Sequence, residues 1–207
     1  MDFDLISNNL KKSLDVFMAN IVAYIVGILI ACIGSCLFIT MPPLMYGLYY
    51  MGVKGSRGDK VEIKDVFAGF KSVSVFIRSW IFFIIPLVIA IIFGVVIGIV
   101  ISFAATVSSG LAFAISLLCA ILYIILAIVL VPVIFYSIYI YIMTPSENVI
   151  YAYKEGFGVF KKNILMTIVA IIITYLVSLL FITTPIGIIF TAYVLKALKP
   201  DLKDNAN

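Results

Sequence analysis

The stretch KGSRGDKVEIKDVFAGFKSVSVFIR, residues 54–78, is the longest charged segment of a chain that is otherwise mostly apolar. It carries six of the fourteen basic residues, and long charge-free runs flank it on both sides. Charged side chains at this density are stable in water or among lipid headgroups, and they are costly in hydrocarbon. The segment therefore fixes the side of a membrane on which the neighbouring helices begin and end.

The composition indicates an integral membrane protein. Hydrophobic residues make up 65% of the 207 residues, charged residues make up 12%, and histidine is absent. The mean hydropathy is +1.27. A soluble domain of this length needs much more polar surface, so the excess of apolar side chains must face lipid. We expect one all-α, polytopic domain over residues 1–207, located in a cell membrane.

Six membrane-spanning helices in three hairpins are expected. They lie in three charge-free runs, residues 16–53, 79–146 and 163–195. The first and last runs hold two short spans each. The first run is expected to break either at Gly34–Ser35 or at residues 40–43, and the last at Pro185, because proline lacks a backbone N–H and disfavours helix at the preceding residue. The middle run holds two longer spans joined by a small, uncharged turn at residues 106–110. Tyrosines 136, 139 and 141 are expected as interfacial aromatic residues at one edge of this run.

Amphipathic surface helices are expected before the hairpins. Within residues 3–15, apolar side chains recur at helical spacing and polar ones occupy the other faces, which is typical of an interfacial helix or of a simple cap on the first span. A second such helix is expected from Val66, with Asp65 as its N-cap. A capping box at residues 144–147 predicts the start of a third.

The two ends of the chain align without a gap. Residues 3–53 correspond to residues 146–196, and identical residues fall at Phe17 and Phe160, Asn20 and Asn163, Thr40 and Thr183, and Pro42 and Pro185. Residues 61–143 resemble the same unit with longer spans. The sequence therefore predicts an internal repeat of three hairpins, each entered through a surface helix, as occurs in some transporters.

The basic residues predict the orientation of the chain. All fourteen lie in the N-terminal arm, in residues 54–78 and 154–162, and in the C-terminal tail. The turns within the hairpins carry none. By the positive-inside rule, both termini and both charged loops are expected in the cytoplasm.

The sequence gives little support for catalysis. Ionisable residues inside membrane spans usually mark functional sites, yet the ten acidic residues all lie in the charged regions or tails. We therefore expect a non-enzymatic protein with no metal site and no cofactor. The net charge of +4 is clustered beside apolar spans, which favours anionic lipid over nucleic acid as the partner.

The leading functional hypothesis is engagement of anionic lipid headgroups, or of a membrane partner, through the cytoplasmic basic loops and the interfacial helices. A role in envelope maintenance would fit it. The candidate headgroup-binding residues are Arg57, Lys60, Lys64, Lys71, Arg78, Lys161 and Lys162.

A transporter or channel for a small neutral or lipid-like solute is the alternative hypothesis. Broken helices can form such sites, although a kink satisfied by neighbouring hydroxyl groups also explains them. The candidate break residues are Thr40, Pro42, Thr183, Thr184 and Pro185. Small residues recur every fourth position at Gly94, Gly98 and Ser102 and predict a helix-packing ridge, within the chain in preference to between chains. The oligomeric state stays open.

The stretch RGDKVEIKDVFAGF, residues 57–70, carries a family resemblance. It resembles uncharacterised six-span prokaryotic membrane proteins with a proline-containing span, a short basic loop and a D-[hydrophobic]-F-x-G-F motif. Here the span contains Pro42, Pro43 and Gly47, and the motif residues are Asp65, Phe67, Gly69 and Phe70. The group is similar to the membrane domain attached to some glycerophosphodiester phosphodiesterases. The resemblance implies a fold and membrane residence, but no reaction.

Overall fold

The computed structural model describes residues 3–144 and 148–200, and every regular element in these ranges is a helix. Elements labelled α are α-helices and those labelled η are 3-10 helices. In chain order they are α1 Phe3–Ala19, α2 Ile21–Gly34, η1 Phe38–Thr40, α3 Met41–Ser56, η2 Ile63–Phe70, α4 Val73–Val107, α5 Ser109–Met143, α6 Val149–Lys162, α7 Ile164–Ser178, η3 Phe181–Thr183 and α8 Thr184–Leu198. The all-α prediction is confirmed for these residues.

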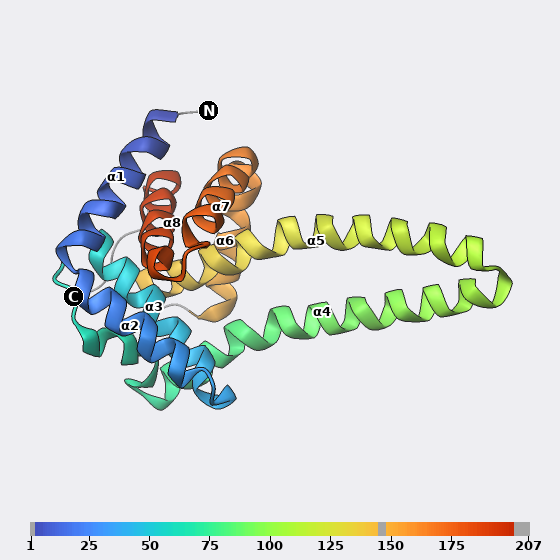
Figure 1. The fold of residues 1–207 in the computed structure, drawn as a ribbon, viewed down its shortest axis with the longest axis horizontal. Coiled ribbons are helices and arrows are strands. Elements are labelled where there is room, and N and C mark those ends of the chain that lie inside the picture. The colour runs from blue at the N-terminus through green and yellow to red at the C-terminus, as the bar shows by residue number, and fades with distance from the viewer. Residues whose placement is uncertain (1–2, 145–147, 201–207) are drawn as a thin grey trace.

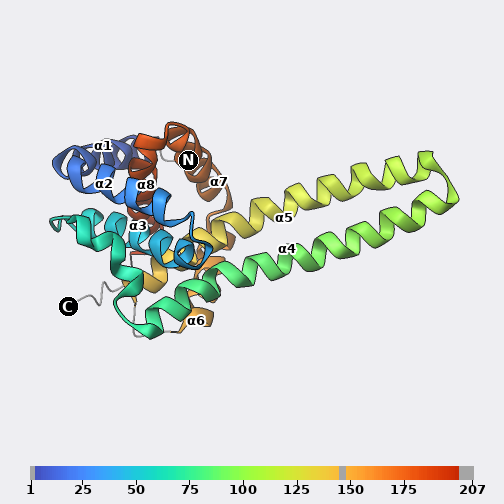
Figure 2. The same ribbon diagram turned by 60° about the horizontal axis from the view of Figure 1, so that its bottom comes forward.

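A long helical hairpin, α4–α5, projects from a body formed by the other elements and the base of the hairpin (Figure 1, Figure 2). Each of its helices has 35 residues and is therefore about 52 Å long. The turn lies at Ser108, whose side chain accepts a hydrogen bond from the backbone N–H of Leu111 and caps α5. This turn falls within the predicted residues 106–110.

Within residues 3–144 and 148–200, three helical segments are long and apolar enough to cross a membrane, namely α4, α5 and the 18 residues Phe181–Leu198. The number rises to five if α1 with α2 and α6 with α7 are each counted as one bent span. The chain is thus a helical protein with the composition of an integral membrane protein.

The chain bends sharply at two asparagines, where a surface helix leads into a hairpin. The angle is 87° between α1 and α2 and 105° between α6 and α7. At each bend the asparagine side chain donates to the carbonyl four residues earlier, Asn20 to Val16 and Asn163 to Val159. Asn20 also accepts from the backbone N–H of Val61 and so joins the first bend to the charged loop.

The same order of elements occurs near both ends of the chain. The series α1, α2, η1 and α3 is followed, after the long hairpin, by α6, α7, η3 and α8. The tips of these hairpins carry matching hydrogen bonds: the Thr40 hydroxyl donates to the carbonyls of Leu37 and Gly34, and that of Thr183 donates to those of Leu180 and Val177. The hydroxyls therefore satisfy carbonyls at the ends of α2 and α7.

Each surface helix packs on the last helix of another hairpin. We call α2–η1–α3 the first hairpin, α4–α5 the second and α7–η3–α8 the third. α1 packs on α8, η2 packs on α3, and α6 packs on α5. Because α3 also contacts α5 and α8, the last helices of all three hairpins form the centre of the body.

The two helices of the first and last runs are separated at residues 35–40 and 179–183, close to the predicted breaks, and prolines 42, 43 and 185 begin the helices that follow. They lie in the first turns of α3 and α8, where the backbone N–H has no partner within the helix. The N-cap of η2 differs from the prediction, which placed it at Asp65. Glu62 is the N-cap of η2, and Asp65 is its third residue. The predicted capping box at residues 144–147 lies mostly outside the described residues, and Asn148 caps α6 through the N–H of Tyr151.

The core of the body is rich in tyrosine. Tyr136, Tyr139 and Tyr141 are buried rather than interfacial, so that prediction was wrong. The reason is that the end of α5 lies in the centre of the body, where a tyrosine hydroxyl can bond to a backbone carbonyl of a neighbouring helix. Tyr139 donates to Ile188 at 2.7 Å, and Tyr24 donates to Met51 at 3.1 Å.

Candidate functional site: two cavities beside helix α3

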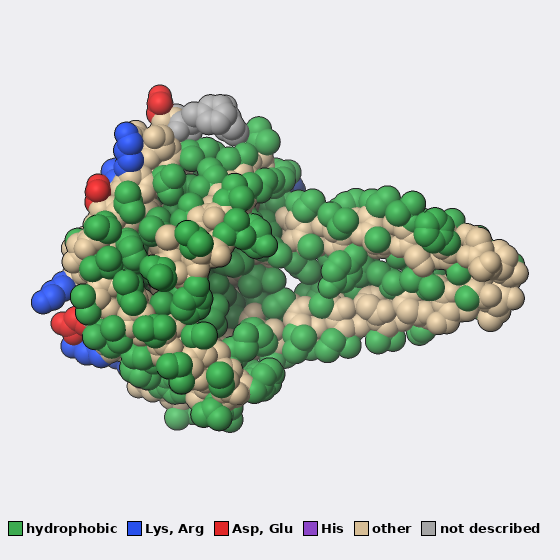
Figure 3. Space-filling view, viewed as in Figure 1, with side chains coloured by type: hydrophobic (Ala, Val, Ile, Leu, Met, Phe, Trp, Pro, Cys, Tyr) green, Lys and Arg blue, Asp and Glu red, His purple; other side chains and the backbone are tan. Residues whose placement is uncertain are grey.

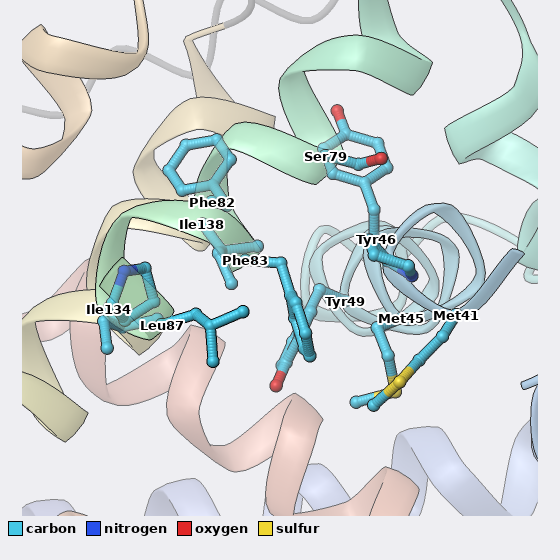
Figure 4. A pocket seen from close by; sticks show the side chains of 12 residues that line it. Met41, Met45, Tyr46, Tyr49, Ser79, Phe82, Phe83, Leu87, Ile134 and Ile138 are labelled. Carbon is cyan, nitrogen blue, oxygen red and sulfur yellow. The ribbon is translucent and has the colours of Figure 1, made fainter. Parts of the chain in front are cut away.

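Two cavities flank α3. The first, of about 390 Å³, lies between α3, α4 and α5 (Figure 4). The second, of about 420 Å³, lies between the first and third hairpins and is closed on another side by α5. The side chains of Met45 and Tyr49 line both cavities, so these two residues of α3 form a common wall.

The first cavity is apolar along most of its length. Figure 4 shows Leu87 and Ile134 at one side and Tyr46 and Ser79 at the other, with Phe83 between them. The hydroxyl of Ser79 is bonded to the carbonyl of Phe76. Small-molecule sites in proteins are typically cavities of this size with apolar walls and a few polar groups. The arrangement suits an apolar chain with a polar end.

A cation lies beside the polar end of the first cavity. Arg78, which precedes the lining residue Ser79, donates from Nη1 to the Tyr141 hydroxyl at 2.7 Å. The Tyr141 ring packs edge-on against Tyr46, with 6.2 Å between ring centroids. Arg78 is half-buried and takes part in none of the ion pairs seen among the described residues.

The second cavity has hydroxyl groups on its wall and no charged residue among those that line it. Its hydroxyl-bearing threonine and serine residues are Ser35, Thr174, Ser178, Thr184 and Thr191. Thr174 and Thr191 lie across from each other on α7 and α8, with 3.0 Å between their hydroxyl oxygens. Both hydroxyls also bond to backbone carbonyls of their own helices, those of Ala170 and Gly187, so this wall suits an uncharged molecule that donates hydrogen bonds to them.

The predicted break residues lie in different places, some on the cavity walls and others at the hairpin tips. Pro42 lines the first cavity and Thr184 lines the second. Thr40 and Thr183 hold the hairpin tips through their hydroxyl groups, and Pro185 is buried at the start of α8. The five residues therefore do not form one site.

The predicted headgroup residues lie mostly on the outside of the body. Lys60, Lys64, Lys71, Lys161 and Lys162 are exposed, and Arg57 and Arg78 are half-buried. In Figure 3 most of the visible charged side chains lie along the margin of the body that is opposite the long hairpin. Lys64 pairs with Glu62 at 2.5 Å, and this hydrogen bond and attraction lower the pKa of the Glu62 carboxyl and raise that of Lys64.

The D-[hydrophobic]-F-x-G-F motif packs η2 against α3. Asp65 pairs with Lys54 at 2.8 Å and is only 8% exposed. Gly69 lies so close to α3 that an added Cβ would be 2.1 Å from the carbonyl oxygen of Pro43. Gly47 approaches η2 in the same way, at 1.7 Å from the carbonyl oxygen of Val66. The motif therefore has a packing role in this fold.

The predicted packing ridge lies on an exposed face of α4. Gly94, Gly98 and Ser102 are exposed, and a Cβ added to either glycine would meet nothing within 4 Å. The contact with α5 uses another stripe of α4, which includes Phe93 against Tyr123 and the buried Ala104. Among the described residues the ridge is thus not part of the α4–α5 contact.

No group of three or more His, Cys, Asp or Glu residues that could hold a metal ion occurs within residues 3–144 and 148–200. Cys32 lies on the wall of the second cavity, and its neighbour Cys36 is exposed near the tip of the first hairpin.

Met45, Tyr46 and Tyr49 are site residues that the sequence analysis missed. A signal was present, because two tyrosines three residues apart inside a charge-free run place polar hydroxyls in an apolar span. No comparable signal marks Met45, since a methionine in such a run is typical of ordinary packing.

No family model matches the chain, and neither a curated protein nor a solved structure matches it. The resemblance to six-span membrane proteins therefore stays a prediction. What the fold and the cavities define is a class, a helical protein of membrane composition with two apolar cavities in its body.

Proposed function

We propose that this chain is a non-enzymatic integral membrane protein that binds lipid. In this proposal apolar chains occupy the cavities beside α3, and the exposed lysines of the cytoplasmic loops contact anionic headgroups. The single observation that carries the proposal is the pair of apolar cavities that share Met45 and Tyr49. Cavities with apolar walls inside a membrane are open to lipid chains more readily than to any other ligand, because lipid is the surrounding solvent.

The proposed topology has one complete hairpin and two short ones. We propose that α4 and α5 cross the membrane, that the first and third hairpins enter it and return, and that both termini are cytoplasmic. The helices of the short hairpins have 14 to 16 residues and are about 21–24 Å long, less than the roughly 30 Å of a bilayer core. The 18-residue segment Phe181–Leu198 is near the lower limit for a span and is about 27 Å long. The tips of the short hairpins are apolar: Phe38 is 63% exposed and Leu180 is 72% exposed.

The tip hydrogen bonds support such re-entrant hairpins. An unsatisfied carbonyl inside a membrane costs several kcal/mol. The Thr40 and Thr183 hydroxyls bond to the carbonyls that the ends of α2 and α7 would otherwise expose. The matching bonds and matching order of elements also support an internal repeat of the first and third hairpins.

Single-cysteine labelling tests the topology. Cys32, Cys36 and Cys119 are first replaced by alanine. A membrane-impermeant maleimide added outside intact cells is expected to modify a Ser109→Cys variant, and neither Phe38→Cys nor Phe181→Cys from either side. A Lys11→Cys variant should react only after the cytoplasmic side is opened. Labelling of Phe38→Cys from outside would show that the first hairpin crosses fully.

Native mass spectrometry of the gently solubilised protein tests lipid binding. We expect anionic lipid to be retained at a fixed stoichiometry and to be lost when Lys60, Lys64, Lys71, Lys161 and Lys162 are changed to glutamine. Filling the common wall with Met45→Trp should also reduce retained lipid, whereas Ile99→Trp on the exposed face of α4 should not. Lipid retention that is unchanged by both the lysine and the Met45 variants would refute the proposal.

A transporter or channel for a small neutral or lipid-like solute is the second candidate. The hydroxyl-lined second cavity between the first and third hairpins favours it, because transporter sites commonly lie between repeats. The test is solute uptake and lipid exchange in proteoliposomes. Rates equal to those of protein-free liposomes, with lipid still bound, would exclude transport and leave lipid binding as the remaining function.

A further inference from the structure

We infer that Arg78, positioned by Tyr141, binds the anionic end of an amphiphile whose apolar chain occupies the first cavity. The end group is a carboxylate or a phosphate. This inference rests on the proposed function, and it adds the chemical class of the ligand and the residue that selects it.

An unbroken series of contacts leads from Arg78 to the cavity wall. Its guanidinium carbon lies 5.7 Å from the centre of the Tyr141 ring, and its Nη1 donates to the Tyr141 hydroxyl. Tyr141 in turn packs against Tyr46 and against Phe82, with 5.3 Å between centroids in the second pair, and both of these residues line the cavity. Arg78 does not itself line the cavity. It lies one side chain, Tyr141, beyond the lining residues Tyr46 and Phe82, near the end that holds Ser79.

The donors of Arg78 are largely unused. A guanidinium has five N–H donors. Within the described ranges, Arg78 makes one side-chain hydrogen bond, to Tyr141, and no ion pair. By contrast, Lys54, Lys64 and Lys199 each pair with a carboxylate. A half-buried cation without an acid is costly, and an incoming anion would relieve that cost.

The type of cation also suits an anionic end group. The planar fork of arginine bonds a carboxylate or a phosphate with two parallel hydrogen bonds, which a lysine cannot do. From Ser79 to Leu87 the cavity follows α4 for about 12 Å, with apolar side chains after its polar end. A charged head at Arg78 and a chain toward Leu87 match this order of polar and apolar groups.

Binding of matched amphiphiles to the purified full chain tests the inference. In nanodiscs of neutral phosphatidylcholine, calorimetry compares palmitate with hexadecanol, and palmitoyl lysophosphatidate with monopalmitoylglycerol. Each pair shares a chain and differs in the anionic group. The variants are Arg78→Gln and, as the matched control, Lys11→Gln, which removes an exposed cation of α1 outside the cavity.

The wild-type chain is expected to bind the anionic member of at least one pair about tenfold more tightly or better. Arg78→Gln should remove this preference and leave binding of the neutral member unchanged, while Lys11→Gln should keep both. A preference confined to the first pair identifies a carboxylate ligand, and one confined to the second identifies a phosphate.

Two results would overturn the inference while leaving the proposed function standing. One is equal binding of anionic and neutral members by the wild-type chain, and the other is a preference that survives in Arg78→Gln. Failure of all four probes to bind would refute lipid binding in the cavity itself. If Arg78→Gln does not fold, Arg78→Lys serves instead, because it keeps the charge and loses the fork. The preference should then fall about threefold or more, and an unchanged preference counts against the inference.

Discussion

The indole N–H of Trp80 donates a hydrogen bond to the carbonyl of Ile39 across 3.3 Å, and the indole ring lies edge-on to Phe38. This contact joins the tip of the first hairpin to the second turn of α4. Beyond Trp80, α4 continues to Val107, which corresponds to about 40 Å of helix. The tip of the first hairpin and the turn at Ser108 therefore lie at different levels along the long hairpin.

Fluorescence quenching can measure the depth of Trp80 in the bilayer, because Trp80 is the single tryptophan of the chain. Trp80 contacts the tip of the first hairpin and lies two residues after Arg78, a residue expected at headgroup depth. A tip that enters only the shallow part of the bilayer therefore predicts that lipids brominated near the headgroup quench Trp80 more strongly than lipids brominated near the chain end. A variant with Trp80→Phe and Ile99→Trp should show the reverse order. Stronger quenching of Trp80 by the deep bromines would contradict the proposed depth.

Glycine substitutions should separate the tight contacts from the open ones. Gly47→Ala and Gly69→Ala place a Cβ 1.7 and 2.1 Å from backbone oxygens, which cannot move without shifting a helix. Each should destabilise the protein by about 3 kcal/mol or more. The matched control Gly98→Ala meets nothing within 4 Å and should be neutral or stabilising by up to about 1 kcal/mol. Thermal unfolding of the purified variants gives the comparison, and a stable Gly69→Ala variant would disprove the contact.

Removing the charge of Asp65 should loosen η2 from α3. Asp65→Asn can keep an acceptor for the N–H of Glu62 while it leaves Lys54 without its partner. We expect a loss of about 2–3 kcal/mol in the free energy of unfolding. Adding Lys54→Met should recover part of this loss, because the uncompensated charge is then removed. Asp59→Asn, at an exposed position, is the control and should change stability by no more than about 0.5 kcal/mol.

The hydroxyl groups at the hairpin tips should contribute equally. Thr40→Val and Thr183→Val keep the shape of the side chain but each remove the single O–H that is shared between two backbone carbonyls. Each change should lower the free energy of unfolding by about 1–2 kcal/mol, and serine at the same position should restore most of it. The measurement is thermal denaturation of the purified variants in detergent. A valine variant as stable as the wild type would show that the hydroxyls are dispensable.

The Glu62–Lys64 pair predicts a pH response in the charged loop. The hydrogen bond and charge of Lys64 lower the pKa of Glu62, so the folded state gains from the ionised carboxyl above the unfolded pKa. That gain is lost as the pH falls through the folded pKa. Because Glu62 is one of three glutamates, carbon-13 labelling of glutamate carboxyls can follow it. Lys64→Met should raise the pKa of Glu62, and an unaltered titration would show that the pair does not form.

The helix boundaries were the part of the fold that the sequence predicted best. Charge, glycine and hydroxyl residues located the turn at residues 106–110 and the break before α3, because turn residues act locally. Pro42 and Pro185 lie just after their breaks, because a proline is favoured in the first turn of a helix, where its missing N–H needs no partner.

The cavities could not be predicted from the sequence, because tertiary packing determines which side chains line them. A helix that is apolar on all sides gives no periodic signal for which side faces protein and which faces lipid. For this reason the ridge at Gly94 and Gly98 was expected in a contact that α4 makes through Phe93 instead. Arg78 was identified from its charge, but its pairing with Tyr141 joins residues 63 positions apart.

The uncharged tips of the three hairpins have a consequence for biogenesis. Moving a charged side chain through hydrocarbon costs at least about 2.5 kcal/mol, whereas the turns around Phe38, Ser108 and Phe181 carry no charge. In the proposed topology, each hairpin could therefore partition into the bilayer as a pair of helices directly from the cytoplasmic side. Assembly of this protein would then require an insertase that catalyses lateral release into lipid, and no motor that drives hydrophilic domains across the membrane.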